Sequence, residues 1–297
     1  MSGNQKKIIF LLILALAVLL LWAVPFYLLP VFRGDREIMA QFYLGPVRFS
    51  AYGLLFALAV IVGYALSRKL LGRAGVDRRH ADDALPWVVV GGLLGARLYH
   101  VLFSLPYYRE HWLETLAVYR GGLAIYGALF GGLVGLYLYA RYRKLGFLKT
   151  LDVAAVALPL AQSIGRWGNF FNQEAFGSPT ALPWRLYVPP AARPAGYLEE
   201  SFFHPAFLYE SLWNLGVFFV VLSVFRRVYP GDSVRPGLVA GVYLVLYSVG
   251  RFLIEGLRLD SFYVNGIKAD QVTALAAVLI GGFLIWRSYA HTNLAVG

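Results

Sequence analysis

Residues 151–177 read LDVAAVALPLAQSIGRWGNFFNQEAFG, an apolar run that ends in a group of polar side chains. The polar part, residues 165–177, brings together a guanidinium, amides and a carboxylate. Ionisable groups at membrane depth cost several kcal/mol, and those that occur there usually mark function. The stretch therefore predicts a membrane helix with a functional site at its end.

The composition of the whole chain points to the same class of protein. Of its 297 residues, 59% are hydrophobic and 14% are charged, whereas soluble domains carry roughly 25% charged residues. The net charge of +11 would suggest nucleic acid in a soluble protein, but basic patches interleaved with aromatic residues are absent. We expect no nucleic-acid partner, and interpret the cations as cytoplasmic loop residues and sites for anionic lipid.

The chain contains no cysteine. This excludes disulfides, thiolate metal sites and a cysteine nucleophile, so any thiol chemistry must use a thiol of the substrate. No cluster of metal-ligating residues is evident, and we expect neither a metal nor a cofactor.

Eight apolar runs predict the fold class, an all-α polytopic membrane helix bundle of about eight transmembrane helices. At ~1.5 Å per residue the first run is long enough to cross a ~30 Å hydrocarbon core. It resembles a signal sequence, but its apolar core is too long and no Ala-x-Ala-like cleavage site follows it, so we expect a retained helix. The runs lie near residues 8–32, 49–66, 85–105, 122–140, 151–164, 206–225, 237–257 and 270–286.

The distribution of lysine and arginine predicts the orientation. With eight spans, the side that holds the N-terminus carries more of these residues than the other, which places both termini in the cytoplasm. Residues 165–205, rich in proline and glycine, then form an irregular extracytoplasmic loop region. We divide the chain into an additional N-terminal helix, residues 1–33, and a membrane domain, residues 43–290.

The motif at residues 165–177 has the groups needed to hold a lipid headgroup. Arg166 can make a bidentate contact to a phosphate, which lysine cannot copy. Asn169 and Asn172 can bond a glycerol hydroxyl or an ester carbonyl, and Glu174 can neutralise Arg166 or handle a proton. The alternative is an interfacial anchor whose arginine meets any phospholipid.

Glycines in two places predict close approach. Gly165 and Gly168 leave room for a headgroup beside the backbone. The repeats at Gly91 and Gly95, and from Gly127 at every fourth residue, predict tight helix packing within the molecule.

A second basic group lies in the run at residues 237–257. Arg251, Glu255 and Arg258 share one helix face with Tyr247, because they are three or four residues apart. The pair of Arg251 and Glu255 could be a buried salt bridge between helices. We favour a second cationic wall for a phosphate, since a neutral pair alone would not need Arg258.

Four further residues are candidates with open roles. Arg97 lies within a run and either contributes to a site or has a structural partner. His204 precedes a proline-initiated helix and could act as a base, although structural histidines are commoner. Tyr126 and Tyr52 are membrane tyrosines of a kind that usually belongs to the aromatic belt.

Residues 165–177, GRWGNFFNQEAFG, resemble the signature of the bacterial phosphatidylglycerol–prolipoprotein diacylglyceryl transferases. The GGLAIYG segment from Gly121, the His204–Pro205 and Tyr209–Glu210 pairs, and Tyr247 through Arg258 are similar to the family's other motifs. The resemblance runs from about Tyr43 to the last span. The usual family core would have seven spans, so residues 8–32 precede it.

This resemblance implies an activity and its residues. Family members move diacylglycerol from phosphatidylglycerol to the lipobox cysteine of a preprolipoprotein in the bacterial inner membrane, forming a thioether and releasing glycerol 1-phosphate. Arg166 would bind phosphatidylglycerol and Arg251 would be the second essential arginine. The cavity would be lined by Tyr52, Asn169, Glu174, Gly177 and Glu255. Some members carry histidine where this chain has Tyr126, so no single base is implied for the whole family.

The rival class is a carrier of lipid or anions, a flippase or transporter that uses Arg97, Arg166 and Arg251 as a relay. Such a relay would place cations at several depths, whereas these groups gather toward the outward face. Intramembrane proteases and zinc enzymes are disfavoured because their motifs are missing.

Overall fold

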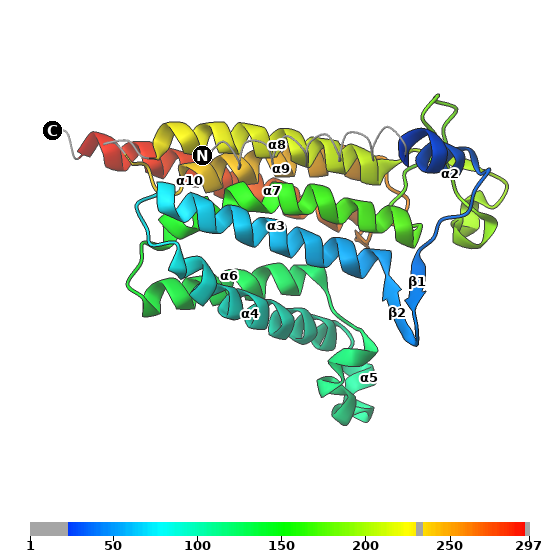
Figure 1. Ribbon diagram of the computed structural model, residues 1–297, viewed down its shortest axis with the longest axis horizontal. Coiled ribbons are helices and arrows are strands. Elements are labelled where there is room, and N and C mark those ends of the chain that lie inside the picture. Colours follow the sequence, from blue (N-terminus) through cyan, green and yellow to red (C-terminus); the bar gives the residue numbers. More distant parts are fainter. Residues whose placement is uncertain (1–22, 230–233, 295–297) are drawn as a thin grey trace. The chain divides into compact units, whose positions relative to one another are not determined.

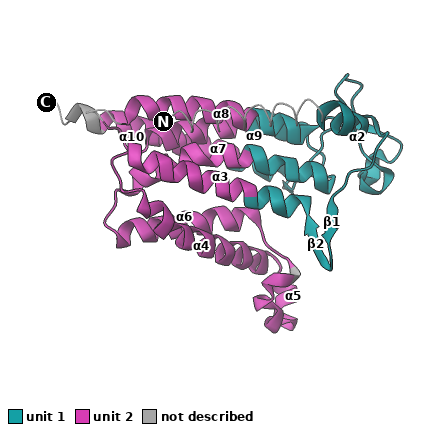
Figure 2. Cartoon of the chain, viewed as in Figure 1, with its two compact units in different colours: residues 1–57, 163–212, 250–273 teal, residues 58–162, 213–249, 274–297 magenta. Residues whose placement is uncertain are grey.

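The structure is a computed structural model, and it describes residues 23–229 and 234–294. Contacts within the chain divide it into two compact units, coloured separately in Figure 2. Unit 1 comprises residues 1–57, 163–212 and 250–273, and unit 2 comprises residues 58–162, 213–249 and 274–297. Each unit has its own hydrophobic core.

Long helices make up most of the described chain (Figure 1). They are α3 (Ala51–Arg73), α4 (Arg79–Phe103), α6 (Ile125–Tyr142), α7 (Phe147–Asn172), α8 (Ala206–Val228), α9 (Leu238–Glu255) and α10 (Ala269–Leu294). Short helical segments are η1 (Val24–Leu28), α2 (Leu29–Arg33), α5 (Leu105–Glu110), η2 (Trp112–Leu116), η3 (Val118–Arg120), η4 (Pro190–Ala192) and η5 (Ala195–Tyr197).

The described residues also form three two-stranded antiparallel sheets. They pair β1 (Gln41–Leu44) with β2 (Val47–Ser50), β3 (Leu186–Tyr187) with β4 (Phe202–Phe203), and β5 (Tyr263–Val264) with β6 (Ile267–Lys268). Residues 165–172 of the region expected to be an irregular loop, residues 165–205, instead continue α7, because the helix ends only where the backbone turns at Gln173. The rest of that region contains the β3–β4 pair, short 3-10 segments and turns.

Six helices of the described chain, α3, α4, α7, α8, α9 and α10, are long and apolar enough to cross a membrane. This confirms a polytopic helical membrane protein. The run at 122–140 corresponds to α6, whose tyrosines and arginine lower its hydropathy. Of the run at 8–32, residues 8–22 lie outside the described residues, and the remainder forms η1 and α2.

In unit 2, α4 and α6 run side by side with their backbones in contact (Figure 1). A Cβ atom added to Gly131 would lie 2.1 Å from the carbonyl oxygen of Gly91, and one added to Gly127 would lie 2.2 Å from that of Gly95. Only glycine permits this approach, so the expectation of tight packing within the molecule is confirmed.

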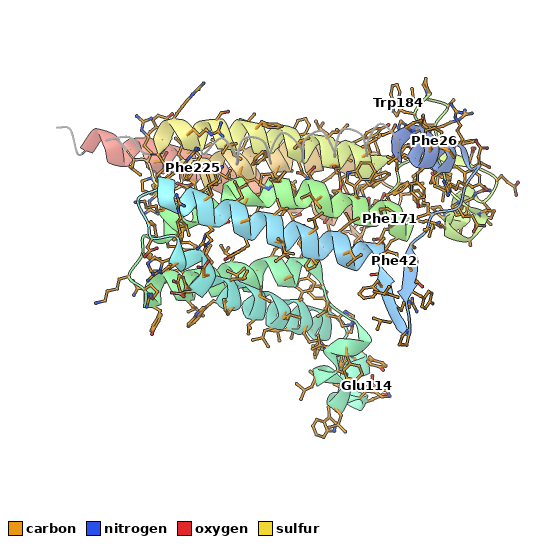
Figure 3. All side chains as sticks on the ribbon, in the orientation of Figure 1. Phe26, Phe42, Glu114, Phe171, Trp184 and Phe225 are labelled. Atoms are coloured by element: carbon orange, nitrogen blue, oxygen red, sulfur yellow. The ribbon has the colours of Figure 1, made fainter. Side chains whose placement is uncertain are left out.

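Among the described residues of unit 2, one carboxylate is buried, that of Asp152, and its partners belong to the same unit. The hydroxyl of Tyr229 and the backbone N–H groups of Gly237 and Ala240 each donate to Asp152 at 2.8 Å. These bonds cap the start of α9. Phe225, labelled in Figure 3, is fully buried in this core.

The core of unit 1 fixes the helix ends that carry the polar motifs. The ring of Phe170, from the last turns of α7, lies 5.2 Å from that of Phe207 in the first turn of α8. Both rings are fully buried. Arg166 lies one turn before Phe170, and Glu210 lies three residues after Phe207, so this contact sets the position of both charged residues.

Candidate active site

A cluster of ion pairs in unit 1 joins Arg166 to Arg251 through the carboxylate of Glu210. The Nε atom of Arg166 lies 2.6 Å from Glu210 Oε2, and Arg251 Nη1 donates to Glu210 Oε1 at 2.5 Å. The three residues come from α7, α8 and α9. The two arginines that the sequence singles out therefore meet at one carboxylate.

Arg251 is enclosed by acids. Its Nη2 atom lies 2.8 Å from Glu255 Oε2, one turn further along α9, and also donates to Asp270 in the first turn of α10. Glu255 is 1% exposed, and its Oε1 atom has no hydrogen-bond donor among the described residues. These contacts fix the plane of the Arg251 guanidinium.

Arg258 follows the end of α9 and completes the cluster. Its Nε and Nη2 atoms donate to the two carboxylate oxygens of Asp260 at 2.9 and 2.7 Å, and Nη1 lies 3.4 Å from Glu210 Oε1. Burial acts to raise the pKa of Asp260, but the hydrogen bonds and charge of Arg258 outweigh it, so that this pKa lies below its ordinary value. Asp260 therefore stays ionised at neutral pH.

The guanidinium of Arg166 keeps an open edge. Its Nε atom is the one nearest to Glu210, and its two terminal nitrogens donate no hydrogen bond to any residue that the structure describes. The side chain is 21% exposed, compared with 12% for Arg251 and 12% for Arg258. Two such nitrogens can bind a phosphate in bidentate fashion.

The end of α7 shapes the rest of the motif. Both Asn169 and Asn172 donate side-chain N–H groups to Glu174 Oε1, at 2.9 and 3.2 Å. Gln173 and Ala175 have φ angles of 56° and 57°, in the left-handed region that non-glycine residues seldom adopt. This turn brings Glu174 back over the helix end.

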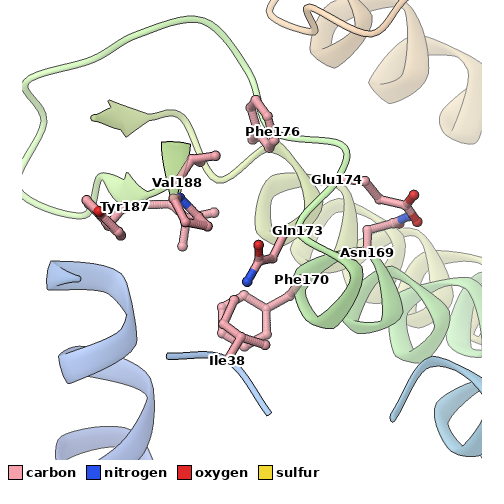
Figure 4. Close-up of a pocket in the computed structure, with 10 residues that line it drawn as sticks. Ile38, Asn169, Phe170, Gln173, Glu174, Phe176, Tyr187 and Val188 are labelled. Carbon is pink, nitrogen blue, oxygen red and sulfur yellow. The ribbon is translucent and has the colours of Figure 1, made fainter. Parts of the chain in front are cut away.

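A small hollow lies beside this turn (Figure 4). Its volume is about 10 Å³, room for a water molecule but not for a headgroup. Figure 4 shows Gln173 directed toward the hollow, while Asn169 and Glu174, which also line it, face one another. The hollow is therefore not the substrate cavity.

Two glycines of the motif are in close contact with other elements of unit 1. A Cβ atom on Gly177 would lie 2.9 Å from that of His204, and the backbone N–H of Gly177 donates to His204 O at 2.8 Å. A Cβ atom on Gly168 would lie 2.6 Å from the ring of Tyr52. The space expected for a headgroup at Gly168 is thus filled by Tyr52, whereas Gly165 has open space.

His204 takes part in a separate hydrogen-bonded chain. Its Nδ1 atom lies 3.1 Å from the Tyr209 hydroxyl, which accepts a hydrogen bond from the indole N–H of Trp184 at 2.8 Å. Tyr209 immediately precedes Glu210 in α8. His204 therefore supports the helix turn that carries the central carboxylate.

Arg97, Tyr126 and Tyr247 belong to unit 2. The buried guanidinium of Arg97 donates to four backbone carbonyl oxygens of the α4–α6 connection, those of Glu114, Thr115, Gly121 and Gly122. These bonds support a structural role for Arg97 rather than a role in the site. Tyr126 is in the first turn of α6, near Tyr99, and Tyr247 stacks on Tyr243 with ring centroids 5.7 Å apart.

Of the acids in the cluster, only Glu255 was among the residues that the sequence singled out. Glu210 and Asp270 were not among the candidate site residues, although both stand at the beginning of an apolar run. Intramembrane acids usually have partners, and this is the signal that could have identified them. Asp260, two residues after Arg258, carried no such signal.

The sequence profile described as prolipoprotein diacylglyceryl transferase matches residues 39–287. The chain belongs to this family. The matched range contains every residue of the ion-pair cluster.

Curated relatives cover nearly all of the chain. A phosphatidylglycerol–prolipoprotein diacylglyceryl transferase of Thermotoga maritima is 44% identical over 290 residues, which is 96% of this chain and 97% of the relative. The enzyme of the same name from Synechocystis is 43% identical over 265 residues, 89% of this chain and 93% of the relative. That of Gloeobacter violaceus is 46% identical over 236 residues, 79% and 87% respectively. The Thermotoga match extends into the residues before the profile begins.

Proposed function

We propose that this chain transfers the diacylglyceryl group of phosphatidylglycerol to the lipobox cysteine of a preprolipoprotein. The relatives carry this activity in their names. The observation that carries the proposal for the site is that Arg166, whose terminal nitrogens donate no hydrogen bond to a described residue, shares the carboxylate of Glu210 with Arg251.

The reaction joins sulfur to carbon. The cysteine thiolate attacks the glycerol carbon that bears the phosphate, the carbon–oxygen bond breaks, and its electron pair stays on the departing oxygen as glycerol 1-phosphate. The proton of the thiol is lost to a base or to solvent. Because the phosphate gains negative charge as it leaves, fixed donors beside it lower the barrier most.

Arg166 is the residue we assign to the phosphate. Its Nε atom is paired with Glu210, so a phosphate would bind at the terminal nitrogens. Arg251, enclosed by Glu210, Glu255 and Asp270, holds Glu210 in place and supplies positive potential. Arg258 also contacts Glu210, so it too helps to hold this carboxylate in place and adds positive potential.

The remaining candidates would hold the rest of the headgroup or the peptide. Tyr52 lies against Gly168 on the face of α7, and Asn169, Asn172 and Glu174 form one hydrogen-bonded group at its end. The base stays open among Tyr126, Glu174, His204 and the positive field alone. A free cysteine has a pKa near ~8.5, which a cationic site lowers.

The finer placement in the membrane is part of the same proposal. We assign the chain to the bacterial cytoplasmic membrane, with eight helices, both termini in the cytoplasm and the cluster toward the outside. The excess of lysine and arginine on the side of the N-terminus supports this orientation.

The test is transfer to a lipobox peptide in liposomes that contain phosphatidylglycerol. Arg166→Ala should reduce formation of the thioether at least about a hundredfold, the scale of losing a transition-state donor, while the protein still folds. Arg185→Ala is the matched control, because that exposed arginine of unit 1 lies over the ring of Phe202 and has no carboxylate partner among the described residues. Full transfer by Arg166→Ala would overturn the assignment. Movement of phosphatidylglycerol between the two leaflets without formation of the thioether would favour a carrier.

A further inference from the structure

A second basic site lies in unit 2, outside the ion-pair cluster. A cavity of about 290 Å³ is lined by Arg68 and Lys69 of α3, by Arg78 of the α3–α4 connection, and by Tyr64 and Ala65. None of these residues takes part in the proposed transfer. Its volume is at the low end for ligand pockets, which is enough for a headgroup but not for acyl chains.

The charge of this cavity is only partly balanced. Asp82 Oδ1 accepts hydrogen bonds from the Tyr64 hydroxyl at 2.6 Å and from Arg68 Nε at 3.0 Å. Lys69 and Arg78 have no ion pair with any described residue. Three cations therefore line the cavity while Asp82 balances one of them, so the cavity attracts anions.

The basic side chains are carried by ordered backbone. The stem of Arg78 lies against α3 at Gly72, where an added Cβ atom would come within 2.6 Å of Arg78 Nε. The short connection is closed by a hydrogen bond from Val76 N–H to Leu71 O, and the Asp77 side chain accepts one from Arg79 N–H. The position of Arg78 is thus set by the end of α3.

An apolar surface leads to the cavity along the same face of α3. Ile61 and Leu58 precede Ala65 by four and seven residues, and their exposed fractions are 61% and 47%. A soluble anion needs only the cations. A lipid needs cations next to an apolar surface, and α3 has both.

We propose that this cavity binds a phosphate group, and that the phosphate is the headgroup of an anionic lipid whose acyl chains lie along α3. The proposal does not depend on the transfer reaction, because it uses other residues and predicts binding without chemistry.

The test counts lipids that stay bound to the full chain in native mass spectrometry from detergent, with phosphatidylglycerol and neutral phosphatidylcholine as probes. The variant Lys69→Gln/Arg78→Gln leaves the Arg68–Asp82 pair intact. The matched control, Arg226→Gln/Arg227→Gln, removes the same charge from exposed residues at the end of α8. Both are also made with Arg166→Ala, to reduce lipid bound at the candidate active site.

We expect one bound phosphatidylglycerol to be weakened about 30-fold in Lys69→Gln/Arg78→Gln, roughly fivefold for each cation, and unchanged in the control. Phosphatidylcholine should be unaffected by either change. Competition by inorganic phosphate at millimolar concentration would identify a soluble phosphate as the occupant and overturn the lipid assignment. Equal affinity in the two double variants would overturn the site.

Thermal unfolding without added lipid checks that the variants fold. If Lys69→Gln/Arg78→Gln does not, Gly72→Ala serves instead, because its Cβ atom displaces the stem of Arg78 and keeps every charge. That variant should weaken the same bound lipid, and unchanged binding there would also count against the site.

Discussion

Glu210 is the residue on which the cluster depends, because it contacts all three arginines from α7, α9 and the segment after α9. It is 4% exposed. Removing one member of a buried ion pair costs about 3–5 kcal/mol, since the remaining charges stay buried without balance.

We therefore expect Glu210→Gln to lower the unfolding temperature of the protein in detergent by several degrees and to abolish transfer. The control is Glu200→Gln, which changes the same charge on an exposed loop of unit 1. An unfolding temperature equal to that of the control would mean that Glu210 does not hold the arginines.

Two glycines one turn apart in α7 offer a second residue-level test. Replacing glycine by alanine inside a helix stabilises it by up to about 1 kcal/mol when space allows. Gly165→Ala meets open space and should raise or preserve the unfolding temperature. Gly168→Ala meets the ring of Tyr52 at 2.6 Å and should lower it, with loss of transfer as the ring moves. Equal effects at both positions would contradict the packing of Tyr52 on α7.

At the scale of single residues, the sequence predicts contacts between residues of the same helix. Arg251, Glu255 and Arg258 are joined as their spacing indicates, through contacts of 2.8 and 3.9 Å to one carboxylate oxygen. Glu210 could not be paired with them in advance, because no periodicity connects residues of different helices. The ring of Tyr52 over Gly168 is unpredictable for the same reason.

At the scale of elements, the contact between α4 and α6 predicts different effects of the same substitution at two neighbouring glycines. Gly131→Ala would place a methyl group 2.1 Å from Gly91 O, a backbone atom that cannot move without the helix, whereas Gly132→Ala meets its nearest atom at 3.6 Å. Overpacking of this kind costs about 1–3 kcal/mol. We expect Gly131→Ala alone to speed proteolysis and lower the unfolding temperature, and similar stability of the two variants would argue against backbone contact.

The helices also show why apolar runs underestimate element length. The predicted run at 151–164 belongs to α7, which continues through the polar motif to Asn172. Hydropathy reports the environment of side chains, whereas the helix ends where the backbone turns, at Gln173 with its positive φ angle. The motif was therefore expected beyond a helix and is mostly inside one.

For the molecule as a whole, the absence of cysteine from the sequence makes the orientation directly measurable. Single cysteines at Arg226 and at Glu199, both exposed, can be labelled in intact cells with a maleimide that does not cross membranes. Both termini in the cytoplasm predict labelling of Glu199→Cys, and of Arg226→Cys only after the membrane is opened. The reverse pattern would invert the proposed topology.

The composition predicted the membrane class, and the unequal distribution of cations predicted a topology that still awaits this measurement. Composition and charge distribution do not predict the division into two units, because five of the long helices contribute residues to both units. No linker or change in composition marks the boundary.

The three arginines of the cluster differ in their contacts with carboxylates, and this difference affects which anionic lipids the site can select. The terminal nitrogens of Arg251 and Arg258 already donate to carboxylates, whereas those of Arg166 donate to no described residue. Of the three arginines, Arg166 alone could then bind a phosphate through both terminal nitrogens, so a lipid with two phosphates would have only one of them bound in this way. The site must then distinguish anionic lipids by the shape and hydroxyl groups of their headgroups. A competing lipid with an additional negative charge should bind only slightly more tightly.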